Sequence, residues 1–203
     1  MKSPYHHGNL KEALLVEAEK ILVNEGMKGL TLRALAKAAG VSATAPYNHF
    51  NNKDTLLEAL ATEGFIQLRK YIDESLRNSS AELKAERIAL GYINYALEHR
   101  QLFRLMFGNE LSQMAPSDAR SNAGRLSFEP IQQAVGEALQ QANHQQLNHH
   151  ATTQGAWSLV HGLATLIIDD KIALPNEPAL RQAEILKIIR PFSLGVYSQP
   201  ATG

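Results

Sequence analysis

The sequence predicts an all-α protein, on three observations. Apolar residues recur at three- and four-residue spacing through most of the chain, as on the buried faces of amphipathic helices. No stretch alternates apolar and polar residues over a strand's length, and nothing repeats at the periods of solenoid proteins. The 203 residues, 44% apolar and 20% charged, suffice for a sizeable core and exclude a disordered chain.

Composition also excludes several classes of protein. The chain has no Cys, which rules out disulfides, thiol nucleophiles, iron–sulfur clusters and Cys-ligated zinc. Residues 1–8 lack the apolar segment of a secretory signal. The most apolar stretch, 156–168, is interrupted by polar residues and is shorter than the ~20 residues that span a bilayer. We therefore expect a cytoplasmic protein with no membrane partner.

The first predicted helix begins after Asn9 and ends at the glycines Gly26 and Gly29. Asn9 and Glu12 form a variant of the capping box, in which Asn replaces Ser or Thr. The buried face of this helix is formed by Leu10, Leu14, Ala18 and Ile21.

Two short helices follow, at 31–39 with Thr31 as the N-cap and at about 43–50. The tight connection Gly40-Val41-Ser42 joins them, and Gly40 supplies the backbone freedom of a sharp turn. Spacing alone leaves two interpretations open, a DNA-binding helix-turn-helix and a plain helical hairpin inside a bundle.

The rest of the chain is predicted to be helical, with two loops. The expected helices are 55–76, 81–100, 101–111, 127–142, 150–169 and 177–197. Ser79 and Glu82 suggest a further capping box, and Pro191 should kink or end the last helix. The segments 112–124 and 143–149 are expected to be loops.

Two stretches decide between the interpretations of the short helices. The segments TLRALAKAAGVS (31–42) and YNHFNNKDTLL (47–57) closely resemble the TetR family of bacterial transcriptional regulators, over about residues 9–60. The resemblance implies an N-terminal three-helix helix-turn-helix domain, followed by a C-terminal helical domain for ligand binding and dimerisation. We expect these at 1–54 and 77–203, with a long connecting helix at 55–76.

In this motif the second helix enters the major groove of double-stranded DNA. Ser42 and Thr44 at its start are candidates for base contacts, and Asn48 could contact either a base or a phosphate. The resemblance implies that Tyr47, His49 and Lys53 hold the phosphate backbone, with Thr31 and Arg33 contributing from the preceding helix. One departure is Pro46, where the family usually has an aliphatic residue; it should alter only the first turn of the recognition helix.

The C-terminal half carries a second resemblance. Trp157, His161 and Gly162 are similar to the Trp…His-Gly signature of one subgroup of TetR regulatory domains. The family implies a small-molecule cavity, although a filled core is the alternative for any single residue. His161 could bind a ligand or a neighbouring helix. The candidate ligand-binding residues are Tyr92, Phe103, Met106, Phe107, Trp157 and His161.

The resemblance also implies a homodimer through the helices at about 150–169 and 177–197. These helices carry more apolar residues than one buried face per helix accommodates, so some of these residues should face the partner subunit. The candidates are Leu159, Val160, Leu166, Ile167, Leu186, Ile189, Phe192 and Val196. A metal site at the cluster of His144, His149 and His150 is disfavoured, because no carboxylates stand at ligand spacing. No cofactor is expected.

These observations favour a DNA-binding regulator, a repressor released from a palindromic operator by an unknown small molecule. One alternative keeps the fold but makes a protein partner the effector; a helical enzyme is a third class, which no catalytic motif supports. A net charge of zero for the whole chain would argue against binding to nucleic acid, but it averages over segments of opposite charge. Residues 1–53 carry seven Lys and Arg against four Glu, a net charge of +3 that the remainder balances.

Overall fold

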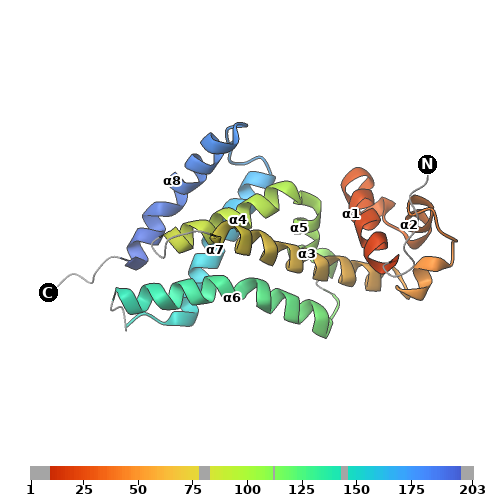
Figure 1. The fold of residues 1–203 in the computed structure, drawn as a ribbon, viewed down its shortest axis with the longest axis horizontal. Coiled ribbons are helices and arrows are strands. Elements are labelled where there is room, and N and C mark those ends of the chain that lie inside the picture. Colours follow the sequence, from red (N-terminus) through yellow and green to blue (C-terminus); the bar gives the residue numbers. More distant parts are fainter. Residues whose placement is uncertain (1–9, 78–82, 112, 143–145, 198–203) are drawn as a thin grey trace. The chain divides into compact units, whose positions relative to one another are not determined.

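The computed structural model describes residues 10–77, 83–111, 113–142 and 146–197, of which 193–197 contribute backbone only, and is helical throughout, with no strand in these ranges (Figure 1). The helices are α1 (Leu10–Gly29), α2 (Leu32–Ala38), the 3₁₀ helix η1 (Ala45–Asn48), α3 (Lys53–Leu76), α4 (Lys84–Glu98), α5 (Arg100–Phe107), the 3₁₀ helix η3 (Asn109–Leu111), α6 (Asp118–Gln141), α7 (His149–Ile168) and α8 (Pro178–Tyr197). This confirms the predicted all-α fold. No helix in the described ranges is long and apolar enough to cross a lipid bilayer.

The chain forms two compact units that interleave along the sequence. The first unit holds residues 1–65 and 101–124, and the second holds 66–100 and 125–203. Both α3 and α6 contribute residues to each unit. The predicted division into consecutive domains remains a prediction.

The first unit is built around a core from α1, α2, the start of α3 and α5. Its most completely buried side chains are Leu14, Leu22, Leu30, Leu35, Phe50, Leu56, Leu60 and Phe103. Phe50 is 1% exposed, as expected for a residue that joins η1 to α3. Phe65 of α3 lies edge-on to Phe107 of α5, with ring centroids 5.4 Å apart.

A buried ion pair also connects α3 to the start of α6 within the first unit. Arg120 Nη1 lies 3.0 Å from Glu58 Oε1, and the two side chains are only 11% and 13% exposed. The other carboxylate oxygen of Glu58 accepts a hydrogen bond from the Ser117 backbone N–H at 3.1 Å. The Arg120 side chain also approaches the Met114 carbonyl oxygen, at 3.4 Å. The carboxylate is therefore held by both a charge and a backbone donor.

The second unit is centred on α4, which packs against α7 and α8. Its buried side chains include Leu68, Ile72, Ile93, Tyr95, Ala164 and Ile185. Gly91 of α4 lies so close to α3 that an added Cβ atom would be 2.8 Å from the Tyr71 carbonyl oxygen. This close approach fixes how the two helices pack.

One element corrects the sequence prediction. The segment 112–124, expected to be a loop, contains the start of α6, which begins at Asp118 rather than near 127. The Ser117 hydroxyl accepts a hydrogen bond from the Arg120 backbone N–H at 3.2 Å, as an N-cap does. Asp118 in the first turn adds a favourable charge at the helix N-terminus.

Smaller corrections concern the helix ends. The helix α1 runs to Gly29 but is interrupted at Gly26, where φ is 68°. The helix α8 continues past Pro191, which therefore does not end it. Leu83 is the N-cap of α4 and makes no side-chain cap bond, and the expected caps at Asn9 and Ser79 lie outside the described residues.

Candidate nucleic-acid interface and apolar cavity

The helix-turn-helix starts with a capped helix, α2. Thr31 is its N-cap, as predicted, and its Oγ1 accepts a hydrogen bond from the Ala34 backbone N–H at 3.1 Å. The turn after α2 passes through Gly40, whose φ of 66° lies in the left-handed region that Gly adopts without strain. Val41 N donates to Ala36 O at 3.0 Å and closes the turn.

The recognition helix is shorter and tighter than expected. An α-helix over about 43–50 was predicted, whereas the structure has the four-residue 3₁₀ helix η1. Tyr47 N donates to Thr44 O at 3.1 Å, and His49 N donates to Pro46 O at 3.0 Å, both i to i+3 bonds. Pro46 sits in its first turn, where the missing N–H costs least, and its side chain is buried.

The predicted DNA-contacting side chains share a solvent-exposed setting. The exposed residues are Thr31, Arg33, Ser42, Thr44, Tyr47, Asn48 and His49. Tyr47 is 54% exposed, so its ring is not a core element. The hydroxyls of Ser42 and Thr44 are 3.2 Å apart and hydrogen-bond to each other. All of these groups are accessible to DNA, and their contacts remain predictions.

Lys53 differs from the other predicted contact residues. It is half-buried, and its Nζ donates a hydrogen bond to Met27 O of α1 at 2.5 Å. The interruption at Gly26 lies beside this carbonyl, and a lysine near the end of a helix interacts favourably with the helix dipole. Lys53 therefore ties the start of α3 to the end of α1, a role that its sequence position did not indicate.

Loss of the α2 cap should destabilise the first unit. Replacing Thr31 by Ala removes the acceptor for the Ala34 N–H, and we expect a loss of about 1 kcal/mol in the free energy of unfolding. Urea denaturation followed by far-ultraviolet circular dichroism measures it. Thr31→Ser keeps a hydroxyl in place and should lose much less; equal losses for both substitutions would contradict the capping role.

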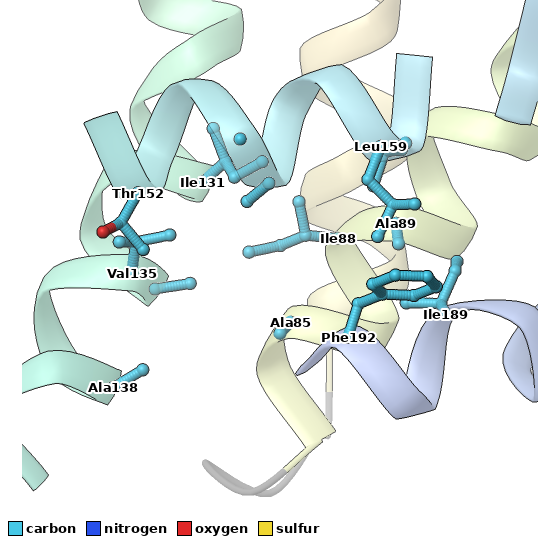
Figure 2. A pocket seen from close by; sticks show the side chains of 14 residues that line it. Ala85, Ile88, Ala89, Ile131, Val135, Ala138, Thr152, Leu159, Ile189 and Phe192 are labelled. Atoms are coloured by element: carbon cyan, nitrogen blue, oxygen red, sulfur yellow. The ribbon is translucent and has the colours of Figure 1, made fainter. Parts of the chain in front are cut away.

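A cavity of about 340 Å³ lies in the second unit, between α4, α6, α7 and α8 (Figure 2). It is lined by Ala85, Ile88, Ala89, Ile131, Ala134, Val135, Ala138, Thr152, Gly155, Ala156, Leu159, Val160, Ile189 and Phe192. In Figure 2 the side chains of Val135 and Ala138 lie on one side of the cavity and those of Ile189 and Phe192 on the other. Among the described lining residues, Thr152 alone carries a side-chain oxygen, and its hydroxyl donates to Asn148 O at 2.9 Å.

None of the six predicted ligand-binding residues lines this cavity. Phe103, Met106 and Phe107 belong to the first unit, where Phe103 and Phe107 pack with ring centroids 4.9 Å apart. Tyr92 and Trp157 border a separate void of about 20 Å³, which shares Ile88, Ile131 and Val160 with the cavity wall. The sequence prediction rested on large aromatic residues, whereas six of the fourteen residues that line this cavity are Ala or Gly, whose small size leaves space.

Tyr92, Trp157 and His161 form a hydrogen-bonded cluster. Trp157 Nε1 donates to the Tyr92 hydroxyl oxygen at 3.4 Å, and that hydroxyl is 2.8 Å from His161 Nδ1. Burial raises the pKa of Tyr92 far above its usual value, with the Trp157 bond opposing this, and burial lowers the pKa of His161. The lowered pKa of His161 favours an uncharged imidazole, to which the Tyr92 hydroxyl can donate. His161 thus contacts a neighbouring helix, one of its two predicted alternatives.

This cluster predicts an acid-sensitive stability. Burial lowers the pKa of His161 in the folded state below its value of about 6.5 in the unfolded chain. The contribution of His161 to the free energy of unfolding is therefore fully present above about pH 6.5 and is lost as the pH falls toward the folded-state pKa. We expect the urea midpoint to drop between pH 7.5 and 5, and to drop less in His161→Gln, which does not titrate. Equal drops in the two proteins would contradict this assignment.

The histidines considered as metal ligands do not assemble a site in the described part of the chain. His149 Nε2 lies 3.0 Å from Gln132 O, His150 is exposed, and His144 falls outside the described residues. Within the described ranges, no group of three or more His, Asp or Glu could hold a metal ion.

Comparison with known proteins bears on both units. Residues 14–60 match the model for bacterial regulatory proteins of the tetR family, and residues 85–186 match a model described as tetracyclin repressor-like, C-terminal domain. The second match does not test the Trp…His-Gly subgroup, which remains a prediction.

Curated relatives match over part of their length. The nucleoid occlusion factor SlmA of Glaesserella parasuis serovar 5 (strain SH0165) is 33% identical over 87 residues, which are 43% of this chain and 43% of that protein. The class C tetracycline repressor of Escherichia coli is 49% identical over 51 residues, which are 25% of this chain and 23% of that protein. The chain thus spans less than half the length of these relatives.

A solved structure extends the similarity to the whole chain. A Rhodococcus sp. RHA1 protein of unknown function superposes with a TM-score of 0.76 at 32% sequence identity, covering 97% of each chain. The two family models match segments in both units, and the Rhodococcus structure covers both units as well. The chain belongs to the tetR family of bacterial regulatory proteins.

Proposed function

We propose that this protein is a cytoplasmic transcriptional repressor that binds a palindromic operator as a homodimer and is released by a small molecule. The observation that carries the proposal is the helix-turn-helix, whose exposed polar side chains lie on α2 and η1, at their ends and in the turn between them. Family membership supports DNA binding and dimerisation, because regulators of this family bind DNA and dimerise. Neither the fold nor the family points to an enzyme.

The exposed side chains divide by chemistry into two kinds of DNA contact. Ser42 and Thr44 carry hydroxyls that can reach base edges, where they would contribute sequence preference. Arg33, Tyr47 and His49 offer charge or donors for phosphates, which supply salt-dependent affinity.

A homodimer through α7 and α8 is supported by apolar side chains that remain exposed in one subunit. Leu166 is 45% exposed and Phe192 is 59% exposed. Of the other candidates, Leu159 and Leu186 are half-buried, whereas Val160, Ile167 and Ile189 pack inside the subunit, and the side chain of Val196 lies outside the description. Two copies would place two helix-turn-helix units on half-sites about 34–36 Å apart.

Regulation requires a ligand that binds the DNA-free arrangement more tightly than the DNA-bound one, since equal affinity shifts nothing. The well-formed apolar cavity favours a small molecule over a protein partner as this effector, because proteins bind on surfaces and small molecules bind in concave apolar sites.

Genome-wide mapping of DNA fragments bound by the full chain tests the proposal. We expect enrichment of a short sequence with two-fold symmetry, and a gel shift with that sequence whose affinity falls steeply with salt. Binding spread evenly over the genome, or no binding, would contradict the proposal.

Substitution of Lys53 tests the predicted contacts with DNA phosphates. If Lys53 exchanges its bond to Met27 O for a phosphate, Lys53→Ala should weaken binding to all sequences and reduce the salt slope by roughly one. Thr44→Ala should instead change the preferred sequence at a similar salt slope. Gel-shift titrations at two salt concentrations measure both. Lys20→Met is the matched control, because Lys20 pairs with Glu17 on α1; an unchanged slope for Lys53→Ala would remove its phosphate role.

A further inference from the structure

We propose that the effector is a neutral, largely hydrocarbon molecule of about 12 to 14 non-hydrogen atoms that occupies the cavity between α4, α6, α7 and α8. The inference rests on the proposed control by a small molecule and narrows its chemical class. It follows from the chemistry of the wall, the volume of the cavity and the neighbouring charges.

Among the residues that the structure describes, the wall contains no charged side chain that would compensate a charged ligand. Its lining consists of Ala, Gly, Ile, Leu, Val and Phe apart from Thr152, whose hydroxyl proton is already donated to Asn148 O. Figure 2 shows this hydroxyl as the one oxygen among the drawn side chains. Since an ion transferred to such surroundings loses its hydration without gaining a partner, the wall selects against carboxylates, phosphates and ammonium groups.

Two charged residues next to the wall in sequence, Arg190 and Glu86, are engaged with each other. Arg190 follows Ile189 of the wall, and Glu86 follows Ala85. The Arg190 guanidinium donates hydrogen bonds to both Glu86 carboxylate oxygens, at 2.9 and 3.1 Å. An anionic ligand that recruited Arg190 would have to break this bidentate pair between α4 and α8.

The volume sets the size of the occupant. A 150 Å³ apolar cavity holds one benzene molecule, so about 340 Å³ accommodates roughly 12 to 14 carbon-sized atoms. A linear twelve-carbon chain or two fused or linked rings meets this limit. Alanine and glycine at six of the fourteen wall positions create the space.

Trp157 provides the readout. It is the only Trp in the chain, and the void that it borders shares Ile88, Ile131 and Val160 with the cavity wall. A ligand that moves these shared side chains changes the environment of the indole, so its fluorescence reports binding without a label.

The experiment compares two probes of equal chain length, 1-dodecanol and dodecanoate, with the full chain below their aggregation limits. We expect 1-dodecanol to bind at least ten-fold more tightly than dodecanoate, by Trp157 fluorescence and by calorimetry. Tighter or equal binding of dodecanoate would overturn the proposed ligand class.

Cavity-filling variants locate the binding. Ala156→Phe and Ala85→Phe place a ring in the cavity from α7 and α4, and each should reduce the affinity for 1-dodecanol at least ten-fold. Ala151→Phe is the matched control, because Ala151 lies on α7, is exposed and is not part of the wall. Circular dichroism identifies variants that fold. Unchanged affinity in a folded Ala156→Phe or Ala85→Phe would overturn the site.

Two further measurements separate this inference from the proposed function. A probe that binds in the cavity but does not release operator DNA supports the ligand class and contradicts release by such a ligand. If no neutral probe binds while operator binding persists, the ligand class is wrong and DNA binding stands.

Sedimentation velocity tests whether a second copy of the chain fills the cavity instead of a ligand. If the wild-type protein is a dimer and Ala156→Phe converts it to a monomer, a second copy fills the cavity and the inference is overturned.

Discussion

Replacing Arg120 by Met is expected to lower the free energy of unfolding by about 3 kcal/mol, because it leaves the Glu58 carboxylate buried without its partner. The two side chains are 11% and 13% exposed, so water screens the pair little. Glu58 Oε1 lies 3.0 Å from Arg120 Nη1 and has no aligned hydrogen bond, so its compensation comes from this charge. Urea denaturation monitored by circular dichroism measures the loss.

Two controls distinguish a lost charge from a lost side chain. In the double variant Glu58→Gln/Arg120→Met the charge is removed and an amide oxygen can still accept from Ser117 N, so most of the loss should be recovered. Lys187→Met breaks a pair with Glu184 whose side chains are 71% and 40% exposed, and should change stability by less than about 0.5 kcal/mol. A loss for Arg120→Met no larger than that for Lys187→Met would contradict the structural role of the buried pair.

The helix-turn-helix could be predicted from the sequence because its determinants are local. Thr31 caps α2 through a bond to a residue three positions later, and Gly40 turns the chain with its own backbone angle. The length of the recognition helix was less predictable. The sequence shows Pro46, but whether its helix continues as α or ends as a short 3₁₀ turn depends on the packing of Pro46 and Phe50 in the core.

The start of α6 was missed because its determinants are distant. The segment around Pro116 and Ser117 has the composition of a loop, and Ser117 N and Arg120 are held by Glu58, 59 residues before Ser117. Local propensity loses to such tertiary contacts, and a single sequence does not show which carboxylate an arginine meets.

The cavity could not be predicted because it is a space that the packed side chains leave unfilled. Large aromatic residues were expected to line it, but Phe103 and Phe107 fill a core and Tyr92 bonds to His161. Space arises where Ala and Gly residues of α4, α6 and α7 line the same cavity, and their juxtaposition depends on how the helices pack.

The close contact between α3 and α4 predicts opposite effects for two Gly-to-Ala substitutions. At Gly91 an added Cβ would lie 2.8 Å from Tyr71 O, 2.9 Å from Ile72 Cα and 2.7 Å from Ser75 Oγ. Two of these atoms belong to the backbone and cannot rotate away, so the helices must separate at a cost of about 1–3 kcal/mol. The gain in helix propensity, up to about 1 kcal/mol, is smaller. We expect Gly91→Ala to destabilise the second unit by roughly 1–2 kcal/mol.

Gly162 of α7 is the matched control, since an added Cβ there meets nothing within 4 Å. Only the propensity effect remains, so Gly162→Ala should stabilise the same unit by about 0.5–1 kcal/mol. Urea denaturation followed by Trp157 fluorescence reports on both, because Trp157 lies in this unit. If Gly91→Ala stabilised the protein as Gly162→Ala is expected to do, α3 and α4 would not pack at the distance found here, since propensity alone predicts the same sign at both positions.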